Sequence, residues 1–216
     1  MTLQAYQREF IEFALGCGAL SFGKFTLKSG RQSPYFFNTG KFDSGARLSR
    51  LGRYYALALQ ASGLEFDMIF GPAYKGIPLA AAVAIGLYEA CGRDLPWASN
   101  RKEIKDHGEG GLILGAALAG RVVIVDDVIS AGTSVKESVA IIRAAGAVPV
   151  GVAIALDREE RGDDKQSAVA MVRERFGLEI VSIISLSGLC EYLRSLPGEN
   201  EHLQAIQAYM VRYRSG

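Results

Sequence analysis

The stretch "RVVIVDDVISAGTSV", residues 121–135, is the part of the sequence that decides the fold. Four apolar residues, 122–125, run directly into two adjacent carboxylates, Asp126 and Asp127. A loop of small residues follows, and helical spacing of apolar residues begins after it. A short strand that is apolar on both faces is typical of a parallel sheet buried between helices. The stretch therefore predicts a strand, a ligand-sized loop and a covering helix.

The same alternation of strands and helices continues from residue 66 onward. It predicts strands at 66–71, 95–100, 121–127, 150–157 and 178–186, with helices at 77–92, 135–147 and 167–176. Helices are also expected at 3–17, at 45–62 and near the end of the chain, and a hairpin is expected within 22–40. We predict an α/β fold with a central, mostly parallel sheet flanked by helices, built as a single domain over residues 1–216.

Composition excludes several classes of protein. The formal net charge of +1 argues against a nucleic-acid binder, which usually has a basic face. No apolar run reaches the ~18 residues of a membrane span, and the start MTLQAYQREF is too polar for a signal peptide. Cys17, Cys91 and Cys190 are widely spaced and odd in number, as expected for reduced, mostly buried thiols of a cytoplasmic protein.

The acid pair and the loop after it predict a site for a phosphorylated sugar. Ligands of parallel sheets bind beyond the carboxyl ends of the strands, where Asp126 and Asp127 lie. Two carboxylates suit a sugar diol or a metal ion, and the small residues of the loop expose backbone N–H groups at a helix start. Thr133 and Ser134 add hydroxyl donors to this cradle for an anion. The alternative is an ordinary helix cap without a ligand.

The motif "VVIVDDVISAGTS" (122–134) resembles the phosphoribosyl pyrophosphate (PRPP) motif of the type I phosphoribosyltransferases. Four other stretches resemble orotate phosphoribosyltransferases in order and spacing: FTLKSGRQSPYFFN (25–38), GPAYKGIPLA (71–80), NRKEIKDHGEGG (100–111) and LDREERG (156–162). With QREFIEFAL (7–15), the resemblance to the short bacterial form covers essentially the whole chain.

The resemblance implies an activity and a more specific fold. The family transfers the phosphoribosyl group of PRPP to orotate, giving orotidine 5′-monophosphate and pyrophosphate in UMP biosynthesis. It requires Mg²⁺, bound mainly through PRPP and water, so no side-chain metal ligand is expected. Fixed cations and the metal neutralise the leaving pyrophosphate. A small hood, mostly from residues 1–45 with parts of the C-terminal region, is implied, as is a homodimer whose lid crosses to the neighbouring site.

The resemblance also assigns PRPP-binding and catalytic residues. Catalytic roles are implied for Lys105, His107, Asp126 and Asp127. PRPP binding is implied for Lys28, Tyr74, Lys75, Arg101, Lys102, Lys105, His107, Asp126, Asp127, Val128, Ile129, Ser130, Ala131, Gly132, Thr133 and Ser134. By charge alone, 101–111 would be a solvated loop and Lys75 a solvated surface lysine; the resemblance implies a mobile lid and a pyrophosphate loop. An unusual backbone, with a cis non-proline bond, is expected at Ala73–Tyr74.

Orotate binding is implied for Lys28, Phe36, Phe37, Ser130 and Arg158. The guanidinium fork of Arg158 suits the carboxylate of orotate. Phe36 and Phe37 contact the base through their backbone in the family, and their side chains could be plain core aromatics. Ser130 stands where the family most often has Thr, and it keeps the hydroxyl.

Three other functions compete with this interpretation. A purine phosphoribosyltransferase would share the acid pair but lack the FTLKSGR and LDREERG stretches. A non-catalytic regulator that senses PRPP could lose lid lysines or an acid, and this chain keeps them. A phosphorylatable signalling domain would leave the first hundred residues or so unexplained. Neither glycine fingerprint of the P-loop and Rossmann proteins occurs.

Overall fold

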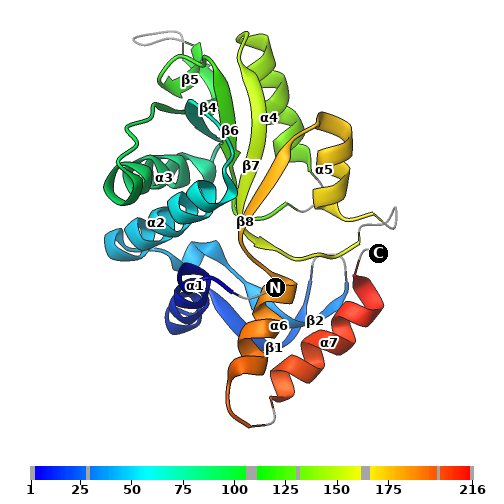
Figure 1. Cartoon of the computed structure of the whole chain (residues 1–216). Coiled ribbons are helices and arrows are strands. Elements are labelled where there is room, and N and C mark those ends of the chain that lie inside the picture. The colour runs from blue at the N-terminus through cyan, green and yellow to red at the C-terminus, as the bar shows by residue number, and fades with distance from the viewer. Residues whose placement is uncertain are drawn as a thin grey trace.

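The computed structural model describes residues 3–27, 30–105, 111–129, 132–161, 166–198 and 200–214. Its centre is a six-stranded sheet in the order β5-β4-β3-β6-β7-β8 (Figure 1). The strands are β3 (Met68–Gly71), β4 (Trp97–Lys105), β5 (Gly111–Gly115), β6 (Arg121–Val125), β7 (Val148–Asp157) and β8 (Glu179–Ser185). All neighbours pair in parallel except β4 and β5, which are antiparallel. The predicted α/β fold with a mostly parallel sheet is confirmed.

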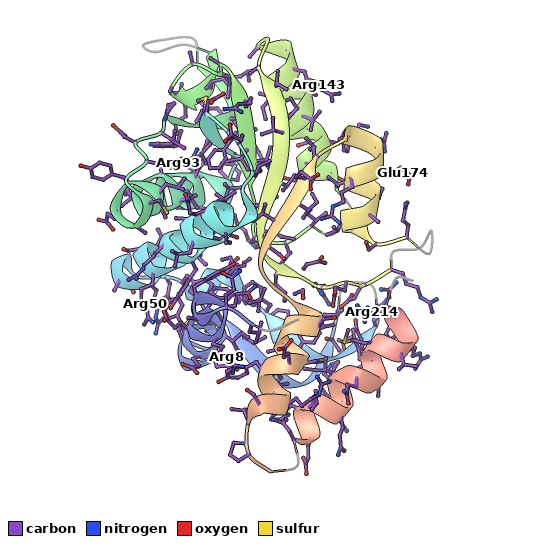
Figure 2. The ribbon with its side chains drawn as sticks, in the orientation of Figure 1. Arg8, Arg50, Arg93, Arg143, Glu174 and Arg214 are labelled. Carbon is purple, nitrogen blue, oxygen red and sulfur yellow. The ribbon has the colours of Figure 1, made fainter. Side chains whose placement is uncertain are left out.

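Helices cover both faces of this sheet, as continuously apolar strands require. Helices α2 (Gly45–Ser62) and α3 (Gly76–Cys91) lie on one side, and α4 (Thr133–Ala144) and α5 (Ala168–Phe176) on the other (Figure 1). Successive residues of β6 serve the two layers in turn: Val123 packs with α2 and α3, and Ile124 with α4 and α5. Charged side chains such as Arg143 and Glu174 lie on the periphery (Figure 2).

Helices α2 and α3 approach so closely that glycine is required where they meet. A Cβ added at Gly52 would overlap the carbonyl oxygen of Ala82. A Cβ added at Gly86 would lie 2.6 Å from the carbonyl of Gly52. Real Cβ atoms do not approach backbone atoms this closely, so the two glycines set the distance between the helices.

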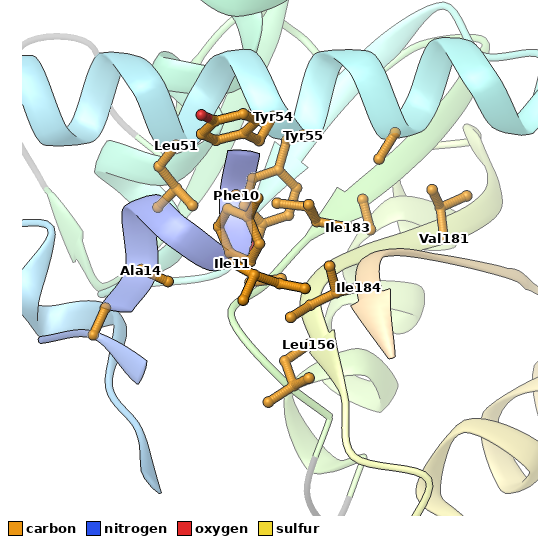
Figure 3. Packing of buried hydrophobic residues seen from close by; sticks show 14 of the residues in the cluster. Phe10, Ile11, Ala14, Leu51, Tyr54, Tyr55, Leu156, Val181, Ile183 and Ile184 are labelled. Carbon is orange, nitrogen blue, oxygen red and sulfur yellow. The ribbon is translucent and has the colours of Figure 1, made fainter. Parts of the chain in front are cut away.

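A second layer lies at one end of the sheet and is built from both ends of the chain (Figure 1). It contains α1 (Ala5–Gly16), the antiparallel pair β1 (Leu20–Thr26) and β2 (Gln32–Phe37), α6 (Leu186–Ser195) and α7 (Glu201–Tyr213). Phe10 of α1, Tyr55 of α2 and Ile183 of β8 belong to one hydrophobic cluster (Figure 3). The layer therefore shares its core with the main sheet.

The interpretation of residues 101–105 as loop, on their charge, is wrong. They continue β4, and β5 was not predicted at all. The ladder runs from Ala98↔Gly115 through Asn100↔Ile113 to Lys105↔Gly111, with an irregularity before the last pair. An antiparallel pair near the edge of a sheet can leave one face open to water, so charged residues are compatible with a strand there.

Among the helices that the structure describes, none combines the length and the apolar character needed to cross a membrane. Cys17, Cys91 and Cys190 are all free thiols, and Cys190 is buried. Serine side chains cap several helix starts, for example Ser167, whose Oγ accepts a hydrogen bond from the N–H of Ala170 at 3.0 Å.

Candidate active site

The polar residues singled out in the sequence meet where β3, β6 and β7 end. Parallel strands bring their carboxyl ends to one edge, so the residues that follow each strand become neighbours. The acid pair follows β6, the turn 72–75 follows β3, and Arg158 follows β7. Residues 36–39 approach this edge from the layer that contains β2, because Thr39 contacts Asp127. The site therefore combines three strand ends with one segment from the first forty residues.

Asp126 is held by the protein on both carboxylate oxygens. Its Oδ1 accepts a hydrogen bond from the backbone N–H of Asp127 at 2.8 Å, and its Oδ2 accepts one from Ser134 Oγ at 2.8 Å. Burial raises the pKa of the Asp126 carboxyl above 3.8, the Ser134 hydrogen bond opposes this, and the charge of Asp127 adds to it. The buried hydroxyl of Tyr55 donates to the backbone carbonyl of Asp126 at 2.8 Å and fixes the end of the strand from below.

Asp127 has a different set of partners. Its Oδ1 accepts from the N–H of Val128 at 2.9 Å. Its Oδ2 accepts from Thr39 Oγ1 at 2.9 Å and from Lys75 Nζ at 2.7 Å. The two acids thus face different neighbours, as adjacent residues of an extended chain do. Lys75, an expected pyrophosphate ligand, is therefore paired with Asp127, an expected sugar ligand. The Lys75 side chain remains 68% exposed.

The turn after β3 is held closed by its own backbone and by the side chain of Asn100 from β4. The peptide bond Ala73–Tyr74 is cis, as expected. The N–H of Ala73 donates to Asn100 Oδ1 at 2.9 Å, and the N–H of Gly76 donates to the carbonyl of Pro72 at 2.9 Å. A Cβ added at Gly71 would overlap the carbonyl oxygen of Gly76, so the two ends of the turn touch. The two ends of the turn are therefore fixed relative to each other, and residues 72–75 lie between them.

Lys102 is brought to the same turn from β4. Its Nζ lies 4.9 Å from the centre of the Tyr74 ring, and the Tyr74 side chain is largely exposed. Arg101 lies beside it in β4, and Lys105 closes the strand opposite Gly111, where only its backbone is described. Two positively charged residues that were predicted to bind pyrophosphate, Lys75 and Lys102, therefore flank Tyr74.

Among the described residues, no side chain caps the start of helix α4, so neither acid of the pair acts as an ordinary helix cap. Gly132 precedes the helix with φ of 70°, and Thr133 and Ser134 form its first turn. The first N–H groups of a helix need acceptors, and a phosphate is well suited to provide them. Of the loop before it, Val128 and Ile129 pack partly against the two core clusters.

Arg158 lies in a cluster with Glu160 and Tyr35. Its Nη2 and Nε donate to Glu160 Oε1 at 2.8 and 3.0 Å, and its Nε also lies 3.2 Å from Tyr35 Oη. The neighbouring Phe36 is 41% exposed and stacks on Phe25, with 5.4 Å between the ring centres. Phe37 packs on Phe10 and Phe42, so its side chain is a core aromatic, one of the two interpretations left open by the sequence.

Four of the expected site residues lie outside the described residues: Lys28, His107, Ser130 and Ala131. Three others had not been singled out at all, namely Thr39, Tyr55 and Asn100, although each donates to or accepts from the site's backbone or acids. Thr39 follows the motif FTLKSGRQSPYFFN by one residue, and Asn100 begins the motif of the lid, so their positions were a weak signal. Nothing in the pattern around Tyr55 distinguishes it from other apolar positions of its helix.

Comparison with known proteins gives a consistent result. The model of the phosphoribosyl transferase domain matches residues 43–186. An orotate phosphoribosyltransferase of Thioalkalivibrio sulfidiphilus (strain HL-EbGR7) is 61% identical over 211 residues, which cover 98% of this chain and 99% of the relative. The enzyme of that name from Pseudomonas aeruginosa (strain UCBPP-PA14) is 58% identical with the same coverage.

The fold agrees with a solved structure of the same group. The crystal structure of the Francisella tularensis orotate phosphoribosyltransferase has a TM-score of 0.87 and 38% identity, covering 96% of this chain and 100% of that one. Since relatives that are more than half identical match it almost end to end, the chain belongs to the orotate phosphoribosyltransferase family.

Proposed function

We propose that this protein transfers the phosphoribosyl group of PRPP to orotate, forming orotidine 5′-monophosphate and pyrophosphate on the route to UMP. The observation that carries the proposal is the acid pair Asp126–Asp127 beside the uncapped start of α4. This arrangement offers carboxylates to a ribose diol and free N–H groups to its 5′-phosphate within one loop. The relatives that match the full chain carry the name of this activity.

PRPP is bound by three groups of residues in this proposal. Asp126 and Asp127 accept hydrogen bonds from the ribose hydroxyls. The loop 128–132, with Thr133 and Ser134, holds the 5′-phosphate. Tyr74, Lys75, Arg101 and Lys102, together with Lys105 and His107 of the lid, hold the pyrophosphate, and the exposed pair of Lys75 and Asp127 opens when the substrate arrives. Until then the charges of Lys75 and Asp127 offset each other, so this pair adds no net charge to the site.

The chemistry requires breaking the bond between the anomeric carbon and pyrophosphate while a ring nitrogen of orotate approaches. Negative charge builds on the pyrophosphate, and cations held in place before the reaction stabilise it best. Lys105 is the residue that stabilises the leaving group most directly, and His107 donates a hydrogen bond or a proton. Orotate is oriented by Lys28, Ser130, the backbone of Phe36 and Phe37, and the guanidinium of Arg158.

Magnesium fits this site as a partner of the substrate. Mg²⁺ in phosphate-transfer sites usually takes one or two carboxylates at most and completes its shell with substrate phosphates and water. The described residues contain no group of three or more His, Cys, Asp or Glu side chains arranged around a metal. We propose that the ion enters with PRPP; when bound, it neutralises charge on the pyrophosphate. Calorimetric titration with PRPP should show tighter binding with Mg²⁺ than with EDTA.

We also propose a single domain in which residues 1–45 form most of the hood over the site, a homodimer with shared sites, and a cytoplasmic location. The common core of α1, α2 and β8 supports the single domain. The three free thiols suit a reducing compartment.

The direct test of the activity follows the loss of orotate absorbance after PRPP and Mg²⁺ are added. Adenine and hypoxanthine serve as the matched controls. Turnover with a purine and not with orotate would replace the proposal with a purine enzyme. PRPP binding without turnover on any base would instead identify a regulator.

A further inference from the structure

Glu160 is a largely buried carboxylate that collects three hydrogen bonds on a single oxygen. Its side chain is 13% exposed. Oε1 accepts from Arg158 Nη2 at 2.8 Å, from Arg158 Nε at 3.0 Å and from Tyr35 Oη at 3.0 Å. Arg31 Nη1 lies 3.8 Å from the other oxygen, Oε2. Because all three bonds are accepted by an ionised carboxylate that is largely withdrawn from water, this cluster is stiffer than an ordinary surface ion pair.

Tyr35 stays protonated and therefore keeps donating to Glu160 Oε1, and Tyr209 lies in the same cluster without a hydrogen-bond partner among the described residues. Burial is the main cause that raises the pKa of Tyr35, and Glu160 contributes in the same direction. Burial, and after it the charge of Glu160, raises the pKa of Tyr209 to about 12. Tyr35 comes from β2 and Tyr209 from α7, so the carboxylate is enclosed by the layer that lies over the site.

Glu160 also determines which part of Arg158 remains available. A guanidinium has a side edge, formed by Nε and Nη2, and an end edge, formed by Nη1 and Nη2. The side edge of Arg158 is occupied by Glu160. No described residue accepts a hydrogen bond from Nη1, so the end edge is left for a ligand.

We propose that Glu160 is a positioning residue: it holds the side edge of Arg158 so that the end edge meets the substrate carboxylate. This inference rests on the proposed function, which assigns Arg158 to orotate. The cluster fixes a long side chain in advance, and a pre-oriented fork loses less freedom when the ligand binds. A second reading of the same contacts is that Glu160 competes with orotate for Arg158, and the two readings predict opposite changes.

The decisive variant is Glu160→Gln, which keeps the size and one acceptor oxygen but removes the charge. If Glu160 positions Arg158, the KM for orotate should rise about 10-fold, the size of one charge-assisted hydrogen bond. The KM for PRPP should not change, because the pyrophosphate and sugar ligands lie on other strands. An unchanged or lower KM for orotate, in a protein that unfolds at the wild-type temperature, overturns the proposal.

A double-mutant cycle separates this inference from the assignment of Arg158 itself. Arg158→Lys alone should raise the KM for orotate, since a point charge cannot replace the fork. On that background Glu160→Gln should add almost nothing, because its effect passes through the guanidinium. If Arg158→Lys leaves orotate unaffected, the assignment of Arg158 is wrong. If Arg158→Lys raises the KM and Glu160→Gln does not, only the positioning role is wrong.

Two further variants guard against a trivial result. Glu65→Gln removes an exposed carboxylate that pairs with Arg121 far from the site, and its kinetics should equal those of the wild type. Tyr35→Phe removes one donor to Glu160 Oε1, together with a weaker acceptor of Arg158 Nε, and leaves the carboxylate in place. Should Glu160→Gln fail to fold, Tyr35→Phe carries the test: a smaller rise in the KM for orotate supports the proposal, and an unchanged KM in the folded variant refutes it.

Discussion

At the scale of single residues, the two adjacent acids are not equivalent. Asp126 bonds to Ser134 of the helix that follows, whereas Asp127 bonds to Lys75 and Thr39, which come from two other segments. In the proposed function, protonation of Asp126 removes an acceptor for the ribose hydroxyls. The environment of Asp126 should therefore set how the use of PRPP depends on pH.

The first prediction concerns the acid limb of kcat/KM for PRPP. Because burial raises the pKa of the Asp126 carboxyl, activity should fall with decreasing pH at a higher pH than an ordinary aspartate would give. Ser134→Ala removes a hydrogen bond that lowers this pKa and should shift the limb to higher pH. Asp127→Asn removes a charge that raises the pKa of Asp126, so the acid limb of the residual activity should shift to lower pH. PRPP itself titrates identically in the assays of the wild type and the two variants, so the differences between their acid limbs report on the protein. Shifts in the same direction for both variants would contradict the assignment of the limb to Asp126.

Thr39 gives the second prediction. Thr39→Val keeps the shape and removes the hydroxyl that donates to Asp127 Oδ2. The lost bond should lower kcat/KM for PRPP by about 3- to 10-fold, corresponding to about 0.5–1.5 kcal/mol. Thr39→Ser, which retains the donor, is the control and should stay close to wild type. Equal losses in both variants, measured in the same absorbance assay, would mean that packing and not the hydroxyl matters.

The positions that gather at the strand ends could be predicted from the sequence far better than the contacts that hold them. The acid pair, the loop and Arg158 stood out because unusual residues follow apolar strands. Thr39 and Asp127 are 88 positions apart, and Tyr35 and Glu160 are 125 apart. No local pattern encodes such contacts; only the folded chain brings the partners together.

At the scale of elements, apolar runs bounded by glycine or proline gave good predictions for the buried strands and for α3, which ends at Gly92 as expected. The failure at β4 and β5 has a physical cause. The charged end of β4 pairs only with the edge strand β5, so one face can stay in water, and the existence of such a strand depends on its partner rather than on its own composition. The backbone pairing of Lys105 with Gly111 could not be inferred from either segment alone.

The third prediction tests the close contact of α2 and α3. Gly52→Ala introduces a methyl group into the backbone of Ala82 and should lower the free energy of unfolding by about 1–3 kcal/mol. Gly45→Ala lies in the same helix, where an added Cβ meets nothing within 4 Å, and should be neutral or slightly stabilising. Urea unfolding of both variants measures the difference. Equal stabilities would show that the two helices can separate without cost.

At the scale of the whole molecule, both ends of the chain return to the layer over the site. Arg214, at the end of α7, pairs with Glu159 next to Arg158, and Figure 2 shows it beside the loop that follows β7. The predicted order of elements did not determine where the C-terminal helices pack, because helices at the end of a sequence can pack on either side of a sheet. The layer is fixed by a core shared between α1, α7 and β2.

The fourth prediction addresses assembly. Lys105→Ala damages the lid and Asp127→Asn damages the sheet site, so each alone should be nearly inactive. If the lid acts across a two-fold dimer, co-refolding should restore about a quarter of wild-type activity, because about half of the dimers are mixed and each holds one intact site. A tag on one partner confirms exchange. Absence of recovery despite mixed dimers would mean that each lid serves its own subunit.

The contact between Gly71 and Gly76 has a consequence for how this sequence can evolve. The two backbones touch, so neither position has room for even a methyl group. A side chain of any size is therefore excluded at these two positions, while Tyr74 between them is largely exposed and contacts Lys102 rather than the backbone of the turn. A saturation library selected for growth without external pyrimidine should return glycine alone at 71 and 76. Sterics alone thus fix the residues at the two ends of the turn, whereas any constraint on the tip comes from the ligand that it binds.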